Sequence, residues 1–233
     1  MDKKETEKNI HAGHRERLRK RFLSSGLDGF SEHEVLELLL CYAIARRDTN
    51  GLAHRLIDRF GSLSGVLDAS ANELMSVDGV GQQAAVLIKL IPQMSRKYQI
   101  SGIIGSQKPT LDKSDKMGQF ITPYFQSETE EVVYMICLDQ RCKLICVELC
   151  ARGSEYSSVA SVKSIVETAA RNKAFSVVLA HNHPGGTTYP SMEDRKATRQ
   201  IRDALALVDI SLADHLIVAG SEFASMNENG YLD

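Results

Sequence analysis

The stretch FSVVLAHNHPGGTTYPSMED, residues 175–194, decides how the second half of the chain folds. Its first six residues form a short apolar run, which is typical of a strand buried in the middle of a sheet. His181 and His183 follow directly, and alternation along an extended segment points both side chains the same way. Pro184 and two glycines then turn the chain. This turn brings Asp194, one turn into the next helix, back toward the two imidazoles.

Two imidazoles and one carboxylate make a ligand set that binds zinc and leaves the fourth coordination position open for water. A water bound there has its pKa lowered to about 7, which makes it a source of hydroxide at neutral pH. The sequence therefore predicts one Zn²⁺ ion held by His181, His183 and Asp194, although such a set also accepts other divalent ions. In a second interpretation, Ser191 is the N-cap of the next helix and Asp194 its capping-box partner. The two roles are compatible.

The residues on either side of this stretch alternate between strand and helix patterns. The expected elements are strands at 132–138, 143–149 and 215–219, and helices at 162–169 and 191–207. The first two strands are separated by a plausible hairpin turn at 139–142. Strands that alternate with helices predict a mixed α/β domain over residues 110–233, with helices covering a sheet.

The first half of the chain has a different residue pattern, which predicts a series of helices. Ser31 and Ser70 each open a capping-box pattern, which predicts the start of a helix. Residues 99–112 contain glycine, serine and proline without periodicity, which predicts a linker. We therefore expect an all-α domain over residues 1–105, ahead of the α/β domain.

Within the helical half, residues 70–90 read as two helices joined by a Gly-Val-Gly turn, the pattern of a helix-hairpin-helix. Glycines let a backbone approach a phosphate closely, and the second helix offers free N–H groups at its positive end. This predicts contacts of Gly79 and Gly81 with DNA, while a purely structural hairpin is the alternative. Arg19 and Arg21 lie in a basic stretch, which is either a phosphate-binding stripe or a solvated helix face.

Composition narrows the class of protein further. The chain has 233 residues, of which 43% are hydrophobic and 25% charged, as in a globular protein of one or two domains. Its 28 basic and 30 acidic side chains nearly balance, so net charge indicates no particular partner. Apolar runs are far shorter than the roughly 20 residues of a membrane span, and no signal peptide is recognisable. We therefore expect a cytoplasmic protein that does not enter a membrane.

Four of the five cysteines cluster at Cys137, Cys142, Cys146 and Cys150. Without an export signal, they are expected to be reduced thiols. Their spacing invites a metal site, but structural zinc sites usually have two residues between paired cysteines. On a strand, residues four apart share one face, so small buried side chains are the favoured interpretation.

The metal-binding pattern resembles the JAMM motif of MPN-domain (JAB) metalloproteases, through His181, His183, Pro184, Ser191 and Asp194. The flanking text at 198–199 and 214–218 is similar to that of the bacterial RadC proteins, and the resemblance spans nearly the whole chain. It implies an MPN/JAB-like fold for the α/β domain. Gly185 stands where the family usually has serine, but that serine is not a metal ligand, so the motif is complete.

The resemblance also implies roles for residues around the three ligands. Ser191 would donate a hydrogen bond to the water or to the developing oxyanion. Glu131, just before a predicted strand, matches the JAMM glutamate and would be the general base. Glu148 is the alternative base, and a solvated charge at the start of a strand is the other interpretation of Glu131. His215 and Asp214 are expected behind the site or in the core.

Two functions follow from these expectations. The first is a RadC-like zinc metallohydrolase that cleaves peptide or isopeptide bonds with a zinc-bound water. Its helical domain would dock it on DNA, in line with the association of the family name with DNA repair. The alternative is a non-catalytic, DNA-associated factor whose MPN domain is a scaffold with a structural metal. The complete motif favours the hydrolase, because a scaffold does not need an open coordination position.

Overall fold

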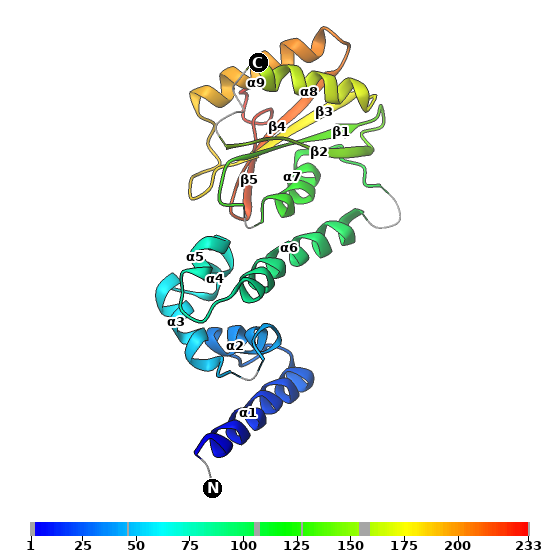
Figure 1. The fold of residues 1–233 in the computed structure, drawn as a ribbon. Helices are drawn as coiled ribbons and strands as arrows, with labels where there is room; N and C mark the ends of the chain where they lie inside the picture. Colours follow the sequence, from blue (N-terminus) through cyan, green and yellow to red (C-terminus); the bar gives the residue numbers. More distant parts are fainter. Residues whose placement is uncertain (1–2, 46, 105–107, 127, 154–158, 233) are drawn as a thin grey trace. The chain divides into compact units, whose positions relative to one another are not determined.

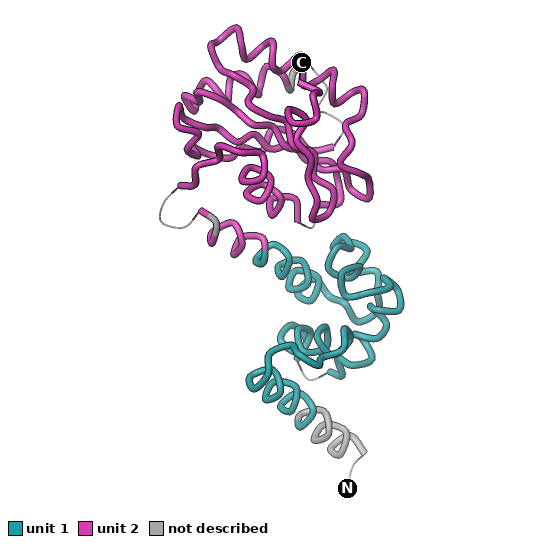
Figure 2. The backbone as a smooth tube through the Cα atoms, turned by 180° about the vertical axis from the view of Figure 1, so that it is seen from behind, with its two compact units in different colours: residues 1–95 teal, residues 96–233 magenta. Residues whose placement is uncertain are grey.

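The computed structural model describes residues 3–45, 47–104, 108–126, 128–153 and 159–232. Contacts along the chain divide it into two compact units, residues 1–95 and residues 96–233 (Figure 2). Each unit has its own hydrophobic core, as expected of separate domains. Among the described residues, no helix combines the length and the apolar composition needed to cross a bilayer.

The first unit is helical (Figure 1). Its elements are α1 (Lys3–Ser25), α2 (Glu32–Ala43), α3 (Asn50–Phe60), α4 (Leu63–Asp68), α5 (Ala71–Met75) and the first part of α6 (Gln82–Ile104). Both predicted capping boxes are present, at Ser31 before α2 and at Ser70 before α5. They explain where these helices begin, because a capping box satisfies N–H groups that the first turn leaves unpaired.

The turn between α5 and α6 buries its middle residue. Val80 belongs to the core cluster of the first unit, together with Leu52 and Leu74. Gly79 has a left-handed φ of 95°, and a Cβ there would lie 3.5 Å from the side chains of Leu52 and Arg55. Packing within the unit therefore accounts for Gly79 by itself, without a nucleic acid.

The second unit is a five-stranded mixed sheet with helices on both faces (Figure 1). In the order β2-β1-β3-β4-β5, the sheet contains β1 (Val132–Leu138), β2 (Leu144–Arg152), β3 (Ser176–Asn182), β4 (Ser211–Ala219) and β5 (Glu222–Ser225). β3 and β4 run parallel and are connected through α9 (Met192–Ala206), whereas the other neighbouring strands are antiparallel. The predicted α/β architecture, with an MPN/JAB-like sheet, is confirmed.

The two faces of the sheet carry separate core clusters. Helices α8 (Val159–Arg171) and α9 cover one face, over buried residues such as Met135 and Leu179. Helix α7 (Ser114–Ile121) and the short 3-10 helix η1 (Thr122–Phe125) cover the other, where Ile136 is buried. β1 and β3 are buried along their whole length, because they are central strands covered on both sides. The burial of these central strands fixes the position of the histidines at the end of β3.

The linker predicted at 99–112 is wrong over residues 99–104. Residues 99–104 are the end of α6, which accommodates Gly102. Residues 105–107 lie outside the described residues. Further on, the Leu111 N–H donates to the Cys142 carbonyl at 2.7 Å, and the Leu144 N–H donates to the Pro109 carbonyl at 2.9 Å. Residues 108–112 are therefore an irregular segment held to the hairpin turn by backbone hydrogen bonds.

The clustered cysteines are structural in the described part of the chain. Cys137, Cys146 and Cys150 contact the core under α8, and all five cysteines are free thiols. Burial raises the pKa of the Cys150 thiol to about 12, which makes it a poor nucleophile. Cys142 lies before β2, in the hairpin turn predicted at 139–142, with a φ of 56°.

Gly118 in α7 gives a stability prediction, because a Cβ there would lie 2.2 Å from the ring of Phe223 on β5. We expect Gly118→Ala to lower the free energy of unfolding of the second unit by about 1–3 kcal/mol through overpacking. Gly102→Ala is the matched control and should be neutral or slightly stabilising, since nothing lies within 4 Å of its Cβ position. Urea denaturation followed by circular dichroism compares the two, and equal stabilities would contradict this packing.

Candidate metal centre

The three predicted ligands come from two elements that meet at the end of β3. His181 is in β3, His183 follows it, and Asp194 is in the first turn of α9. The Nε2 atoms of the two imidazoles are 2.9 Å apart. Asp194 Oδ1 lies 3.3 Å from His181 Nε2, and Asp194 Oδ2 lies 3.4 Å from His183 Nε2. Among the described residues, this is the group of His, Cys, Asp and Glu side chains that could hold a metal ion.

The three side chains are close enough for one ion to contact all of them. Zinc bonds of about 2.0–2.1 Å place neighbouring ligands of a tetrahedron about 3.3 Å apart. The separations of 3.3 and 3.4 Å match this value but involve different oxygens of Asp194, and the two nitrogens are 2.9 Å apart. One ligand atom from each residue can be chosen so that all three lie within 4.8 Å of one another. The side chain of His183 is 16% exposed, against 3% for His181, so solvent reaches the group from the side of His183.

Hydrogen bonds behind the two imidazoles decide which nitrogen is free for a metal. His183 Nδ1 is 2.7 Å from the carbonyl oxygen of Thr187, so this nitrogen carries a proton and donates it. His181 Nδ1 is 2.8 Å from Nε2 of His215. If His181 Nδ1 also donates, both Nε2 atoms keep a lone pair on the side of Asp194, as metal ligation requires.

His215 and Thr198 fix the direction of donation. Burial lowers the pKa of His215 well below its ordinary value, so this ring is neutral. Its Nδ1 is 2.6 Å from Thr198 Oγ1, which in turn donates to the Asp194 carbonyl at 2.5 Å. Because Thr198 uses its proton on the carbonyl, it accepts from His215 Nδ1, and His215 Nε2 accepts from His181. One chain of hydrogen bonds, the His181–His215–Thr198–Asp194 relay, therefore connects the candidate ligands His181 and Asp194. It runs from His181 Nδ1 to the backbone carbonyl of Asp194, away from the atoms that would bind a metal.

Sequence reasoning placed His215 only in general terms, behind the site or in the core, and gave Thr198 no role. The structure puts both in direct contact, fully buried. The available signal was spacing: Thr198 follows Asp194 by four residues, which puts both on one face of α9. Asp214 is also buried, and its Oδ1 accepts the His215 N–H at 2.7 Å.

Ser191 has the capping role that the sequence allowed. Its Oγ accepts the Asp194 N–H at 3.0 Å and donates to Asp194 Oδ2 at 2.7 Å, while its own N–H donates to the same oxygen at 2.8 Å. Burial acts to raise the pKa of the Asp194 carboxyl, but without a metal a protonated His181 beside it and the two hydrogen bonds from Ser191 outweigh burial and hold that pKa well below its usual range. Asp194 is therefore a carboxylate, the form that ligates metals.

Glu131 is exposed and stands directly before β1. Asn182, the residue between the two histidines, makes hydrogen bonds to the backbone on both sides of Glu131. Asn182 Oδ1 accepts the Val132 N–H at 2.7 Å, and Asn182 Nδ2 donates to the Glu130 carbonyl at 3.0 Å. The alternative base, Glu148, is on β2, two strands away from β3, where it accepts a hydrogen bond from an asparagine at 3.3 Å.

The residues predicted to contact DNA lie on two separate elements of the first unit. Arg19 and Arg21 are on α1, and Gly81 directly precedes α6. Arg21 pairs with Glu34 at 2.8 Å and stacks on the Phe30 ring at 3.7 Å, so its charge is used within the unit. Arg19 is exposed, and nothing lies within 4 Å of the Cβ position of Gly81.

Comparison with known proteins agrees with this architecture. The family model of the RadC-like JAB domain matches residues 111–231, and that of the UPF0758 N-terminal region matches residues 11–86. The fold and its ligand group thus define a JAB-domain protein with a candidate metal centre.

Individual relatives give the family. A UPF0758 protein of Fusobacterium nucleatum is 33% identical over 225 residues, which cover 94% of this chain and 97% of the relative. UPF0758 proteins of Burkholderia mallei and Burkholderia pseudomallei are 32% identical over 214 residues, 92% of this chain and 76% of each relative. This chain belongs to the RadC family.

Zinc content tests the ligand group. Purified without chelator, the full chain should hold about one equivalent of zinc, and His181→Ala and Asp194→Asn should each lose it, because a metal site needs its full ligand count. His54→Ala removes an exposed imidazole of the first unit and is the control that should keep the metal. Atomic emission spectrometry gives the ratio of zinc to protein. A full equivalent in His181→Ala would place the ion elsewhere.

Thr198→Val tests the relay, because it keeps the shape of the side chain but removes its hydroxyl. Loss of such an outer partner typically weakens metal binding by about 10–100-fold, and we expect the zinc Kd to rise by that factor. Thr198→Ser restores the hydroxyl and should bind zinc almost normally. Competition with a chromophoric chelator measures all three affinities. An unchanged Kd in Thr198→Val would show that the relay does not orient the ligands.

Proposed function

We propose that this RadC family protein is a zinc-dependent hydrolase of amide bonds, in peptides or isopeptides. The ligand group supports this most strongly, because two imidazoles and a carboxylate offer ligand atoms that lie within 4.8 Å of one another. Three protein ligands leave one position for water or substrate, as in catalytic zinc sites and unlike closed structural ones. This favours the hydrolase over a scaffold with a structural metal.

The residues around the ligands suit such a reaction. A zinc ion bound by this group would act as a Lewis acid and lower the pKa of a coordinated water to about 7. Glu131 takes the proton of the attacking water and returns it to the leaving amine. Ser191 donates a hydrogen bond to the developing oxyanion, an interaction worth roughly 3 kcal/mol in other enzymes. The Ser191 hydroxyl can turn to the substrate because its N–H still holds Asp194 Oδ2 at 2.8 Å.

The pairing of the strands supports Glu131 as the base. β1 pairs with β3 so that Val133 lies opposite His181, and directly paired residues share a face of the sheet. Alternation continued back by two residues puts Glu131 on the face that carries His181. The hydrogen bonds of Asn182 to Val132 and to the residue before Glu131 hold that backbone in place. Glu148, two strands away, is the weaker candidate.

Two finer proposals concern partner and location. We propose that the helical unit docks the protein on duplex DNA through two features: the N-terminus of α6, which directly follows Gly81, and the exposed Arg19 on α1. Helix N-termini bind phosphate through their free N–H groups, and such contacts carry little base information. We also propose a cytoplasmic location, which suits the five free thiols.

Glu131→Gln tests the mechanism. This variant should keep its zinc and lose about 100-fold or more in rate, because an amide cannot accept the proton. Glu130→Gln is the matched control, since the structural contact of Glu130 to Asn182 runs through its backbone. Mass spectrometry of peptide and isopeptide panels measures cleavage, with zinc content determined in parallel. Wild-type rates in Glu131→Gln would contradict its role, and zinc-loaded wild-type protein that cleaves none of the panel would favour the scaffold.

DNA binding is tested by its salt dependence. Affinity for a random-sequence duplex should fall as salt rises, because phosphate contacts release counterions. Arg19→Ala should reduce the slope of log K against log salt by about one, the effect of one lost phosphate contact. Arg141→Ala, in the hairpin turn of the second unit, is the control. Binding that is absent or independent of salt would remove the DNA proposal.

A further inference from the structure

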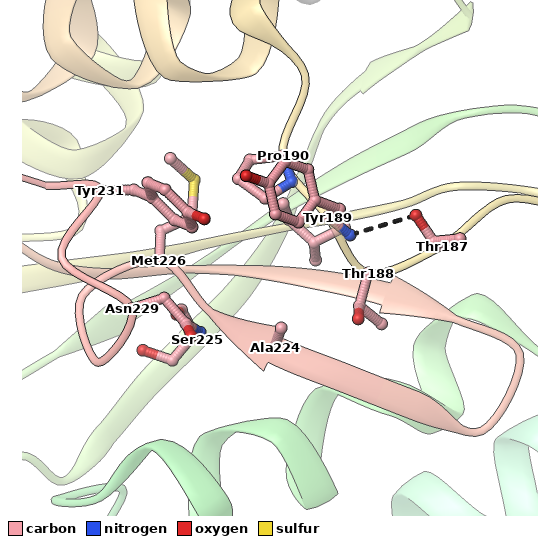
Figure 3. Close-up of a pocket in the computed structure, with 10 residues that line it drawn as sticks. Thr187, Thr188, Tyr189, Pro190, Ala224, Ser225, Met226, Asn229 and Tyr231 are labelled. Atoms are coloured by element: carbon pink, nitrogen blue, oxygen red, sulfur yellow. Dashed lines mark hydrogen bonds between the residues drawn. The ribbon is translucent and has the colours of Figure 1, made fainter.

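A cavity of about 200 Å³ lies between the loop that follows His183 and the chain around the end of β5 (Figure 3). Part of its wall is the loop that joins His183 to α9, and Thr187 of this loop accepts the hydrogen bond from His183 Nδ1 at 2.7 Å. The opposite wall is Met226 and Tyr231, from the chain that follows β5. Figure 3 shows Tyr189 and Pro190 of the loop above Ala224 of β5.

The register of the sheet sets the distance from this cavity to the ligands. His181 of β3 pairs with Ile217 of β4, which pairs with Ala224 of β5. Residues in one such row share a face of the sheet, so Ile217 and Ala224 point to the same side as His181. Neighbouring strands are about 4.8 Å apart, so Ile217 lies roughly 5 Å and Ala224 roughly 10 Å from His181 across the sheet.

Six of the ten residues that line the cavity are apolar or aromatic, and the other four are polar: Thr187, Thr188, Ser225 and Asn229. Ile217, Ala224 and Met226 contribute aliphatic or thioether groups. The rings of Tyr189 and Tyr231 meet edge to face, with centroids 5.9 Å apart. Their arrangement is braced by a cation, because the guanidinium of Arg195, the residue after Asp194, lies 4.1 Å from the Tyr231 ring and 5.5 Å from the Tyr189 ring. This positive charge disfavours a basic group in the cavity.

The size of the cavity limits its occupant. Pockets that enclose whole drug-sized ligands measure about 300–1,000 Å³. A cavity of about 200 Å³ is too small for such a ligand and suits a single side chain. An extended peptide advances about 3.3 Å per residue, so a side chain one to three positions from an amide at the metal would reach the lining residues.

We propose that this cavity, the side-chain pocket, binds an apolar or aromatic side chain of a peptide substrate next to the scissile bond. The inference rests on the proposed hydrolysis and adds a substrate preference to it. Substrates with a phenylalanine or leucine at that position are favoured over those with alanine. Lysine and arginine are disfavoured by the positive charge of Arg195, and aspartate by the cost of moving a carboxylate from water to the side of Ile217, Ala224 and Met226.

Peptide hydroxamates test the pocket without turnover, because the hydroxamate chelates zinc and presents its side chains nearby. The zinc-loaded full chain is titrated calorimetrically with acetohydroxamate and with dipeptide hydroxamates carrying phenylalanine, leucine, alanine, lysine or aspartate at each position. At one position at least, phenylalanine or leucine should bind about tenfold or more tighter than alanine, as methylene groups do in apolar pockets. Lysine and aspartate should bind no better than alanine.

Ala224→Leu fills the pocket and should abolish this preference while leaving acetohydroxamate affinity unchanged. Ala206→Leu, the same change on an exposed part of α9, is the matched control and should keep the preference. If acetohydroxamate binds but phenylalanine, leucine and alanine bind equally, or if Ala224→Leu keeps the preference, the side-chain pocket is wrong and the metal centre stands. If acetohydroxamate does not bind, the metal centre and the proposals built on it fail together.

Discussion

The buried hydrogen bond between His181 Nδ1 and His215 Nε2, 2.8 Å long, is the contact on which the site depends. It decides the tautomer of His181 and, through Thr198, ties that ring to the backbone of Asp194. An unsupported imidazole could rotate and present either nitrogen. A relay that ends on a carbonyl has one sense of donation, because a carbonyl oxygen can only accept. The geometry of the candidate ligands is therefore set by His215 and Thr198, which are not part of the candidate ligand group.

The sheet makes this relay possible by bringing three elements together. β3 carries His181, β4 carries His215, and α9, which connects them, carries Thr198 and Asp194. On the opposite side of β4, the Asp214 carboxylate accepts hydrogen bonds from Ser225 at 2.6 Å and from Ser114 at 3.1 Å. His215 and Asp214 are consecutive residues of β4. His215 makes its contacts on the face of the sheet that carries His181, and Asp214 makes its contacts on the opposite face. The parallel β3–β4 connection is the structural requirement behind the motif.

Much of this was readable from the sequence, because the decisive signals are local. β1 was predicted with its observed limits, and the ligands and the Ser191 cap follow from spacing within one loop. The contact of His215 with Thr198 depends on strand register, which a single sequence does not encode locally. β5 has four residues, too few to show a pattern. The partnership of Arg21 with Glu34 and Phe30 needs tertiary packing of α1 and α2.

The central claim is that one ion is held by two imidazoles and one carboxylate at the end of β3. X-ray absorption at the zinc K edge of the purified full chain tests it most directly. The account predicts a single shell of nitrogen and oxygen at about 2.0–2.1 Å with the outer scattering of imidazole rings. A sulfur shell near 2.3 Å would assign the metal to cysteines such as Cys146 and Cys150, and would contradict the account.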